Sequence, residues 1–87
     1  MDDLESEIKT LKNWKRVDNK LQRSLKFKDF VEAFGFVSKI ALISEKMNHH
    51  PDLRIVYNSV DIELTTHDSN GISKNDITLA RKIDELM

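Results

Sequence analysis

Residues 53–64 read LRIVYNSVDIEL, and the spacing of their apolar side chains decides the fold. Leu53, Ile55 and Tyr57 stand at odd positions, whereas Val60, Ile62 and Leu64 stand at even ones. One continuous strand cannot change parity in this way, because successive side chains alternate between the two faces of a sheet. A two-residue turn at Asn58-Ser59 removes the conflict, because it pairs residue 57 with 60, 55 with 62 and 53 with 64. The stretch therefore predicts a β-hairpin with one apolar face.

An earlier stretch, NWKRVDNKLQRSLKF at residues 13–27, predicts a second hairpin with strands over roughly 13–17 and 20–27. Leu21, Leu25 and Phe27 alternate with polar residues, as a half-buried strand requires, and DNK supplies residues typical of a turn. Arg23 interrupts the apolar column, and we expect it at the rim of the core.

The stretch between the hairpins, KDFVEAFGFVSKIALISEKM at residues 28–47, predicts the main helix. Its apolar residues fall into two neighbouring stripes: Phe30, Phe34, Val37 and Ala41 in one, and Phe36, Ile40, Ile43 and Met47 in the other. A helix that packs on one sheet needs a single apolar stripe. The second stripe therefore predicts either another subunit, in a homodimer or homotetramer formed through helix 28–47, or burial beneath the N-terminal helix.

Helical patterns also open and close the chain. Leu4, Ile8 and Leu11 have helical spacing, and Ser73 followed by Asp76 has the spacing of a capping box at a helix start. The predicted element order is thus α-β-β-α-β-β-α. This order indicates a single α+β domain over residues 1–87, with a four-stranded antiparallel sheet and helices packed on one face.

The composition excludes several classes of function. The 87 residues include 33% charged and 39% hydrophobic residues, a formal net charge of -1 and no cysteine. The chain therefore has no disulfide framework and no thiolate nucleophile. No signal sequence or membrane-spanning run is evident, so we expect a cytoplasmic protein without a membrane partner. Basic residues crowd positions 9–28, but no aromatic residues are interleaved on that face, so we expect no nucleic-acid partner.

The histidines are the candidate functional residues, and all three lie in EKMNHHPDLRIVYNSVDIELTTHD, residues 45–68. Extending the predicted hairpin register brings His50 near His67. Three gathered imidazoles could hold a metal ion, act in acid–base catalysis or be ordinary structural residues. Adjacent His49 and His50 diverge on a helix or a strand, which disfavours a metal site. An imidazole titrates near neutrality, so one ring can donate a proton while another accepts one.

These residues resemble the signature of the pterin-4a-carbinolamine dehydratases. The signature runs in order through Glu45, His49, His50, Pro51, Tyr57, His67 and Asp76, within EKMNHHPD, TTHD and the last helix. The helix sequence is also similar to the central helix of that family. The likeness extends from about Trp14 to the C-terminus.

The resemblance implies an oligomeric enzyme that dehydrates 4a-hydroxytetrahydropterin to quinonoid dihydropterin, without a cofactor or metal, in the recycling of tetrahydrobiopterin. By position, His49, His50 and His67 would line the pterin pocket. His49 and His67 are expected to exchange protons with the 4a-hydroxyl and N5, and His50 to bind the ring. Glu45 is expected to orient His49, with Trp14 and Asp76 as further substrate-binding residues, although capping alone could explain Asp76.

The chain also departs from the family pattern. Asn48 and Asn75 stand where animal members tend to carry Asp and Arg, which could alter affinity for the pterin. Some relatives act as a dimerisation cofactor for a transcription factor or in other assemblies. The alternative hypothesis is therefore a non-catalytic dimerisation, coactivator or assembly-type interaction module on the same fold.

Overall fold

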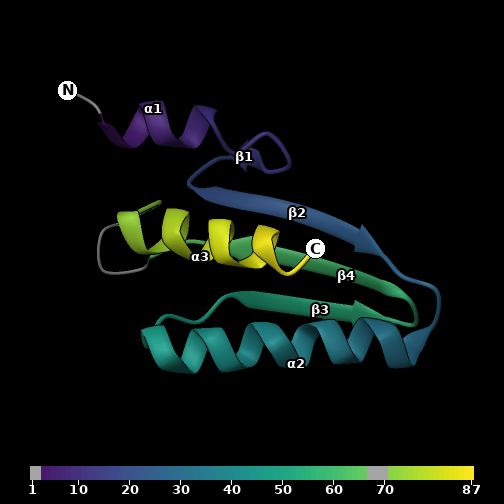
Figure 1. Cartoon of the computed structure of the whole chain (residues 1–87). Coiled ribbons are helices and arrows are strands. Elements are labelled where there is room, and N and C mark those ends of the chain that lie inside the picture. The colour runs from purple at the N-terminus through teal and green to yellow at the C-terminus, as the bar shows by residue number, and fades with distance from the viewer. Residues whose placement is uncertain (1–2, 67–70) are drawn as a thin grey trace.

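The computed structural model describes residues 3–66 and 71–87. In chain order the elements are α1 (Asp3–Lys9), β1 (Lys15–Val17), β2 (Lys20–Lys26), α2 (Phe30–Met47), β3 (Asp52–Val56), β4 (Ser59–Leu64) and α3 (Lys74–Glu85). This order confirms the predicted α-β-β-α-β-β-α arrangement, which Figure 1 follows from the N-terminus to the C-terminus.

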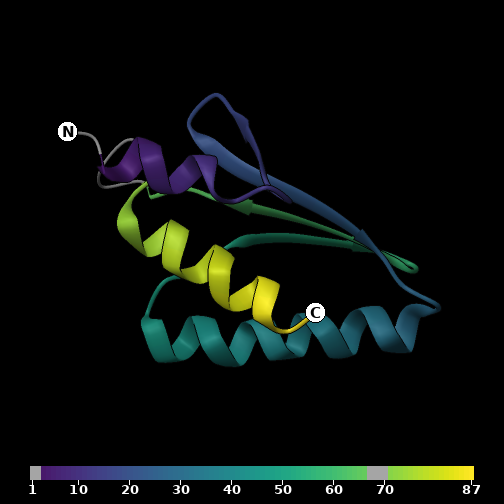
Figure 2. The same ribbon diagram turned by 45° about the horizontal axis from the view of Figure 1, so that its top comes forward.

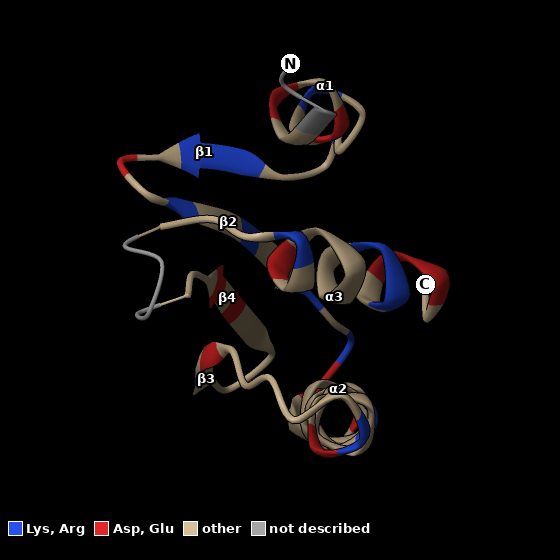
Figure 3. Ribbon diagram, turned by 90° about the vertical axis from the view of Figure 1, so that its left-hand side faces the viewer, with Lys and Arg blue, Asp and Glu red and all other residues tan. Residues whose placement is uncertain are grey.

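The strands form one antiparallel sheet in the order β1-β2-β4-β3, so the two hairpins meet through β2 and β4. Figure 3 looks along the sheet and shows α1, α2 and α3 on the same side of it. The predicted α+β fold class is therefore confirmed. None of the helices in residues 3–66 and 71–87 is both long enough and apolar enough to span a membrane.

The core lies between the sheet and the helices. Val60, Ile62 and Leu64 present their side chains from β4 to this core and are fully buried. Ile40 of α2 and Ile77 of α3 meet them from the helical side. Burying a side chain of this size contributes roughly 1.5–3 kcal/mol. This packing holds α2 and α3 against adjacent parts of the sheet. It thereby fixes the end of α2 relative to the beginning of α3, where the candidate site lies.

The second hairpin exists, but its predicted register is wrong by two residues. Leu53 pairs with Ile62 and Ile55 pairs with Val60, so the turn residues are Tyr57 and Asn58. Tyr57 carries the positive φ of 54° and is 64% exposed, which removes it from the apolar face that was predicted for it.

A contact with the neighbouring loop explains the register. The Asn58 side-chain amide donates to the Phe27 carbonyl at 2.9 Å, and the Phe27 backbone N–H donates to the Asn58 carbonyl at 2.8 Å. These two bonds fix Asn58 at the second turn position. Residues 53, 55, 60, 62 and 64 keep one face in either register, so the apolar pattern alone could not distinguish the two.

The two stripes of α2 have different surroundings. Phe36 and Ile40 are buried in the core, whereas Phe30 and Phe34 are about half exposed, at 50% and 54%. The α1 helix packs near α3 at the opposite edge of the molecule from α2, as Figures 1 and 2 show. The second stripe, with Phe36 and Ile40, is therefore the one that packs in the core, and the expectation that it meets another subunit or the N-terminal helix is wrong. The stripe left exposed is the first one, with Phe30 and Phe34.

Arg23 is partly buried and has a charged partner. Its side chain is only 12% exposed, and its guanidinium group forms an ion pair with Asp84 near the end of α3. The Trp14 indole N–H donates to the same Asp84 Oδ1 at 2.9 Å. Asp84 thus neutralises a charge on the helical side of the sheet and fixes a core aromatic residue.

Candidate active site

The end of α2 determines where the adjacent histidines point. Asn48 has φ 57° and ψ 42°, the left-handed conformation that asparagine tolerates at a helix C-terminus. The Asn48 N–H donates to the Glu45 carbonyl at 3.3 Å, and the His49 N–H donates to the Ser44 carbonyl at 3.1 Å. This pair of bonds is a Schellman motif, which reverses the chain direction and fixes the backbone of His49.

His49 points from this turn to the beginning of α3. Its Nε2 lies 2.5 Å from Asp76 Oδ1, and the His49 side chain is only 12% exposed. Asp76 is 0% exposed. The sequence predicted a functional role for both residues, and the structure brings them together from elements 27 residues apart in sequence.

The second oxygen of Asp76 is also occupied. Asp76 Oδ2 accepts hydrogen bonds from the Ser73 backbone N–H at 2.9 Å and from the Thr66 hydroxyl at 2.7 Å. The first of these bonds completes the predicted capping interaction at the start of α3. Asp76 therefore caps the helix through one oxygen and contacts His49 through the other, so the two explanations of its presence are compatible.

His50 has a different partner. Its Nε2 lies 2.6 Å from Glu45 Oε2, and both side chains are more than half exposed. The prediction that Glu45 orients His49 is therefore wrong, because Glu45 contacts His50 and Asp76 contacts His49. The reason is the left-handed Asn48, because the helical i,i+4 relation between Glu45 and His49 ends where the helix ends. Asp76 occupies the place beside His49 that was predicted for Glu45.

The Asp76 contact sets the hydrogen-bonding roles of the His49 ring. A carboxylate oxygen accepts hydrogen bonds, so the ring donates to it through Nε2–H. In the neutral ring the other nitrogen, Nδ1, then lacks a hydrogen and can accept a proton. A largely buried imidazole held in one tautomer by a buried carboxylate is suited to act as a general base, and as a general acid once protonated.

Trp14 lies elsewhere in the core. It is 8% exposed, and its indole N–H contacts Asp84, eight residues beyond Asp76 on α3. Eight helical residues correspond to about 12 Å along the helix axis. The prediction that Trp14 borders the substrate pocket stays a prediction.

His67 lies outside the described residues, so the predicted proximity of His50 and His67 lies outside them too. In the described part of the chain, no three His, Cys, Asp or Glu side chains group as metal ligands would. The contacts of His49 and His50 lead to two separate carboxylates, which agrees with the expectation that adjacent histidines diverge.

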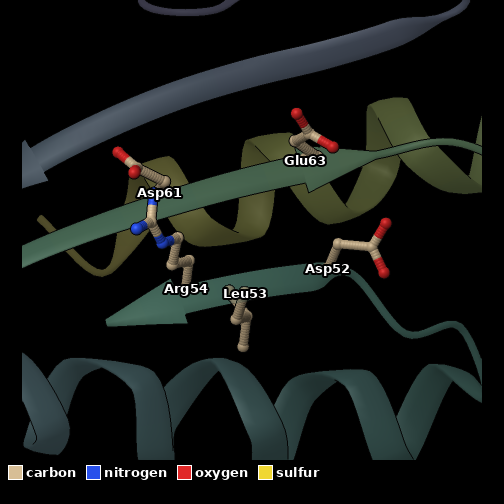
Figure 4. A pocket seen from close by; sticks show the side chains of 5 residues that line it. All are labelled: Asp52, Leu53, Arg54, Asp61 and Glu63. Carbon is tan, nitrogen blue, oxygen red and sulfur yellow. The ribbon is translucent and has the colours of Figure 1, made fainter. Parts of the chain in front are cut away.

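A hollow of about 270 Å³ lies on β3 and β4, lined by Asp52, Leu53, Arg54, Asp61 and Glu63. Figure 4 shows the Arg54 side chain pointing toward Asp61 across the two strands. Glu63 already accepts hydrogen bonds from Lys20 and Gln22, and Asp61 accepts one from Ser24. Because Glu63 and Asp61 already have partners and neither His49 nor His50 lines the hollow, the candidate acid–base site among the described residues is the His49–Asp76 pair.

Thr66 is the residue of this site that was missed in the sequence. Side chains at even positions of β4 point into the core, and position 66 continues that series beyond Leu64. A hydroxyl that follows three buried apolar residues on the same face needs a hydrogen-bond partner. That signal was present in the sequence, although it does not identify Asp76 as the partner.

Comparison with known proteins gives consistent matches. The family model described as pterin 4 alpha carbinolamine dehydratase matches residues 1–86. A protein of Prochlorococcus marinus (strain NATL2A), named as a proposed pterin-4-alpha-carbinolamine dehydratase, is 53% identical over 85 residues, covering 97% of this chain and 88% of its own. A protein of Sulfurisphaera tokodaii with the same name is 44% identical over 85 residues, covering 98% and 91%.

Two solved structures are also similar. The crystal structure of a transcriptional coactivator/pterin dehydratase from Brucella melitensis has a TM-score of 0.90 and 41% sequence identity, covering 98% of this chain and 93% of that chain. A pterin dehydratase-like protein, identified as a RuBisCO assembly factor in the alpha-carboxysome, has a TM-score of 0.69 and 19% identity, covering 84% of each chain. The second likeness concerns the fold alone.

Proposed function

Because this chain belongs to the pterin 4 alpha carbinolamine dehydratase family, we propose that it dehydrates a 4a-hydroxytetrahydropterin to the quinonoid dihydropterin. In this reaction the C4a–O bond breaks and its electron pair leaves with the oxygen, which takes up a proton to become water. The proton on N5 departs, and the nitrogen electron pair forms the C4a=N5 double bond. One group must therefore supply a proton while another removes one.

The contact between His49 and Asp76 is the observation that carries this proposal. It fixes the tautomer and direction of one imidazole, which reduces the reorganisation that proton transfer requires. In the proposed mechanism His49 exchanges a proton with the substrate through Nδ1. The buried Asp76 carboxylate stabilises the imidazolium form that appears when the ring holds both protons.

His67 is the proposed second acid–base residue. Support comes from Thr66, its neighbour in the chain, whose hydroxyl bonds to the same carboxylate as His49. His50 is proposed to bind the pterin ring, with Glu45 orienting its imidazole through the 2.6 Å contact. These roles divide the site into two proton-transfer groups and one binding group.

Stopped-flow absorbance measures the proposed activity directly. The 4a-hydroxytetrahydropterin is generated transiently, and its disappearance is followed with and without the purified chain. We expect a rate well above spontaneous dehydration and a return toward the spontaneous rate in the His49→Ala, His67→Ala double variant. A wild-type rate equal to the spontaneous rate would remove the enzyme assignment.

A second copy of this chain is the proposed partner of the exposed stripe on α2. Phe30, Val31, Phe34 and Leu42 are between 50% and 79% exposed, and the rings of Phe30 and Phe34 lie 6.0 Å apart. Large apolar side chains grouped on one helix face are typical of an interface. We propose that this face forms a homodimer or homotetramer.

Light scattering at micromolar concentration tests this interface. The wild-type chain should give a multiple of 10.1 kDa, and Phe34→Glu should reduce the mass toward the monomer, because an interface buries a carboxylate only at high cost. Thr78→Glu adds the same charge at an exposed position of α3 and should leave the mass unchanged. A monomeric wild-type chain would overturn the interface, whereas an oligomer without dehydratase activity would favour the interaction-module alternative.

A further inference from the structure

Rotation of the Asp76 carboxylate is not fixed by its own covalent structure. The last torsion of an aspartate side chain is broad, so steric preference alone does not choose the orientation of its two oxygens. In this structure Oδ2 accepts hydrogen bonds from Thr66 and Ser73, and Oδ1 faces His49. The orientation of the His49 ring therefore depends on the donors that hold Oδ2.

Thr66 is the side chain that donates to Oδ2 at the shortest distance. Its hydroxyl lies 2.7 Å from Asp76 Oδ2 and 2.6 Å from the Ser73 hydroxyl. When Thr66 donates its single hydrogen to the carboxylate, Ser73 can donate to the Thr66 oxygen. The result is a directed chain of hydrogen bonds from Ser73 through Thr66 to Asp76, in which each bond polarises the next.

The backbone of Thr66 is fixed independently of its side chain. Its N–H donates to the Gly71 carbonyl at 2.8 Å, and the Gly71 N–H donates to the Thr66 carbonyl at 3.1 Å. Gly71 has φ +153°, and a Cβ placed there would come within 3.3 Å of the Asn19 Cβ. The main chain on which Thr66 sits is thus held by two hydrogen bonds and a close approach of the first hairpin, so removing the hydroxyl should leave the backbone in place.

We infer that Thr66 is a positioning residue, which orients His49 through the Asp76 carboxylate. The inference rests on the proposed function for its effect on rate, but the contact itself does not. Removing the hydroxyl takes away the shortest of the hydrogen bonds to Oδ2 and leaves only the Ser73 donors, the backbone N–H at 2.9 Å and the hydroxyl at 3.5 Å. The carboxylate is then held less tightly and the His49 ring loosens, while the groups that bind the pterin remain. The loss should therefore appear in kcat and leave KM nearly unchanged.

The expected effect on the reaction is a fall in kcat of about 10- to 100-fold in Thr66→Val, the range that a small misplacement of a catalytic group produces. KM should stay within about 2-fold, because no binding group is removed. Thr66→Ser keeps the hydroxyl and should restore most of the rate. Thr65→Val is the matched control, because the Thr65 hydroxyl donates to the Asn19 carbonyl and does not contact Asp76.

A second readout does not depend on activity. Nitrogen-15 NMR of the histidine rings, at a pH where the His49 ring is neutral, should show one dominant Nε2–H tautomer in the wild-type chain and in Thr66→Ser and Thr65→Val. The His49 signal is identified by its absence in His49→Gln. In Thr66→Val the signal should move toward a mixture of tautomers. Thr66→Ala provides the same comparison if the valine variant does not fold.

The two readouts separate failure of this inference from failure of the proposed function. An inactive wild-type chain whose His49 tautomer changes in Thr66→Val would contradict the dehydratase assignment and support the positioning role. Unchanged His49 signals in both Thr66→Val and Thr66→Ala would overturn the positioning role, whatever the rate. An equal loss of kcat in Thr66→Ser and Thr66→Val would also contradict it, because only one of these variants lacks the hydroxyl.

Discussion

Replacing His49 with alanine is expected to lower kcat for dehydration by about 10²- to 10⁴-fold, the range that a positioned general acid or base contributes. The variant removes the imidazole whose direction Asp76 fixes, and the described structure offers no other histidine contact with that carboxylate. Stopped-flow measurement at saturating substrate gives kcat directly. The fold should survive, because the ring is at the edge of the core.

His50→Ala is the matched control for this experiment. It removes the adjacent imidazole, which is 55% exposed and contacts Glu45 instead of Asp76. We expect it to raise KM more than it lowers kcat, because its proposed role is ring binding. A His49→Ala variant with at least a third of the wild-type kcat would contradict the acid–base role of His49.

Replacing Asp76 with alanine is expected to lower the free energy of unfolding by about 3 kcal/mol, because it leaves several donors without their buried acceptor. Those donors are the Ser73 backbone N–H, the Thr66 hydroxyl and the His49 ring. The same variant should lose most of its activity, since His49 loses its orienting contact. Urea unfolding at one fixed chain concentration measures the stability, because any oligomer would make it concentration-dependent.

Asp29→Ala provides the comparison at a second helix start. Asp29 is the N-cap of α2 and accepts the Glu32 N–H at 2.9 Å, so its loss should cost about 1 kcal/mol, the usual value for a cap. The Asp29 variant should keep its dehydratase activity. Equal destabilisation by the two variants would show that Asp76 acts only as a helix cap.

Most of the fold could be predicted because local patterns and tertiary packing agree. The change of apolar parity within residues 53–64 required a hairpin, and the two stripes of α2 required two different environments. The register could not be predicted, because both turn positions preserve the apolar face. The contact between Asn58 and Phe27, which are 31 positions apart in sequence, determines which of the two turn positions is adopted.

The candidate site could be predicted in its residues but not in its pairing. His49, Asp76, His50 and Glu45 were each identified, and the structure pairs the first two and the last two. The family resemblance implied that Glu45 orients His49, and the left-handed Asn48 turns His49 away from Glu45. The left-handed conformation of Asn48 does not follow from the residue types of the helix that precedes it.

Two polar residues at core-facing positions were the features of the sequence whose meaning was not fully recognised. Arg23 lies at an inward position of β2, and Thr66 continues the inward positions of β4 just beyond its end. Both have carboxylate partners on α3. A polar group on the face toward the core requires a hydrogen-bond partner, so each of these positions indicated a buried polar interaction. The identity of the partner depends on where α3 packs, and only the folded chain supplies that information.

The central claim is that the imidazoles surround one bound pterin, and NMR of the histidine rings during a ligand titration tests it most directly. The ligand is 7,8-dihydrobiopterin, which has no 4a-hydroxyl and therefore cannot be dehydrated. We predict that the ring signals of His49, His50 and His67 shift together, with one common dissociation constant. Signals of His49 and His67 that do not move, or that saturate at different ligand concentrations, would contradict the account.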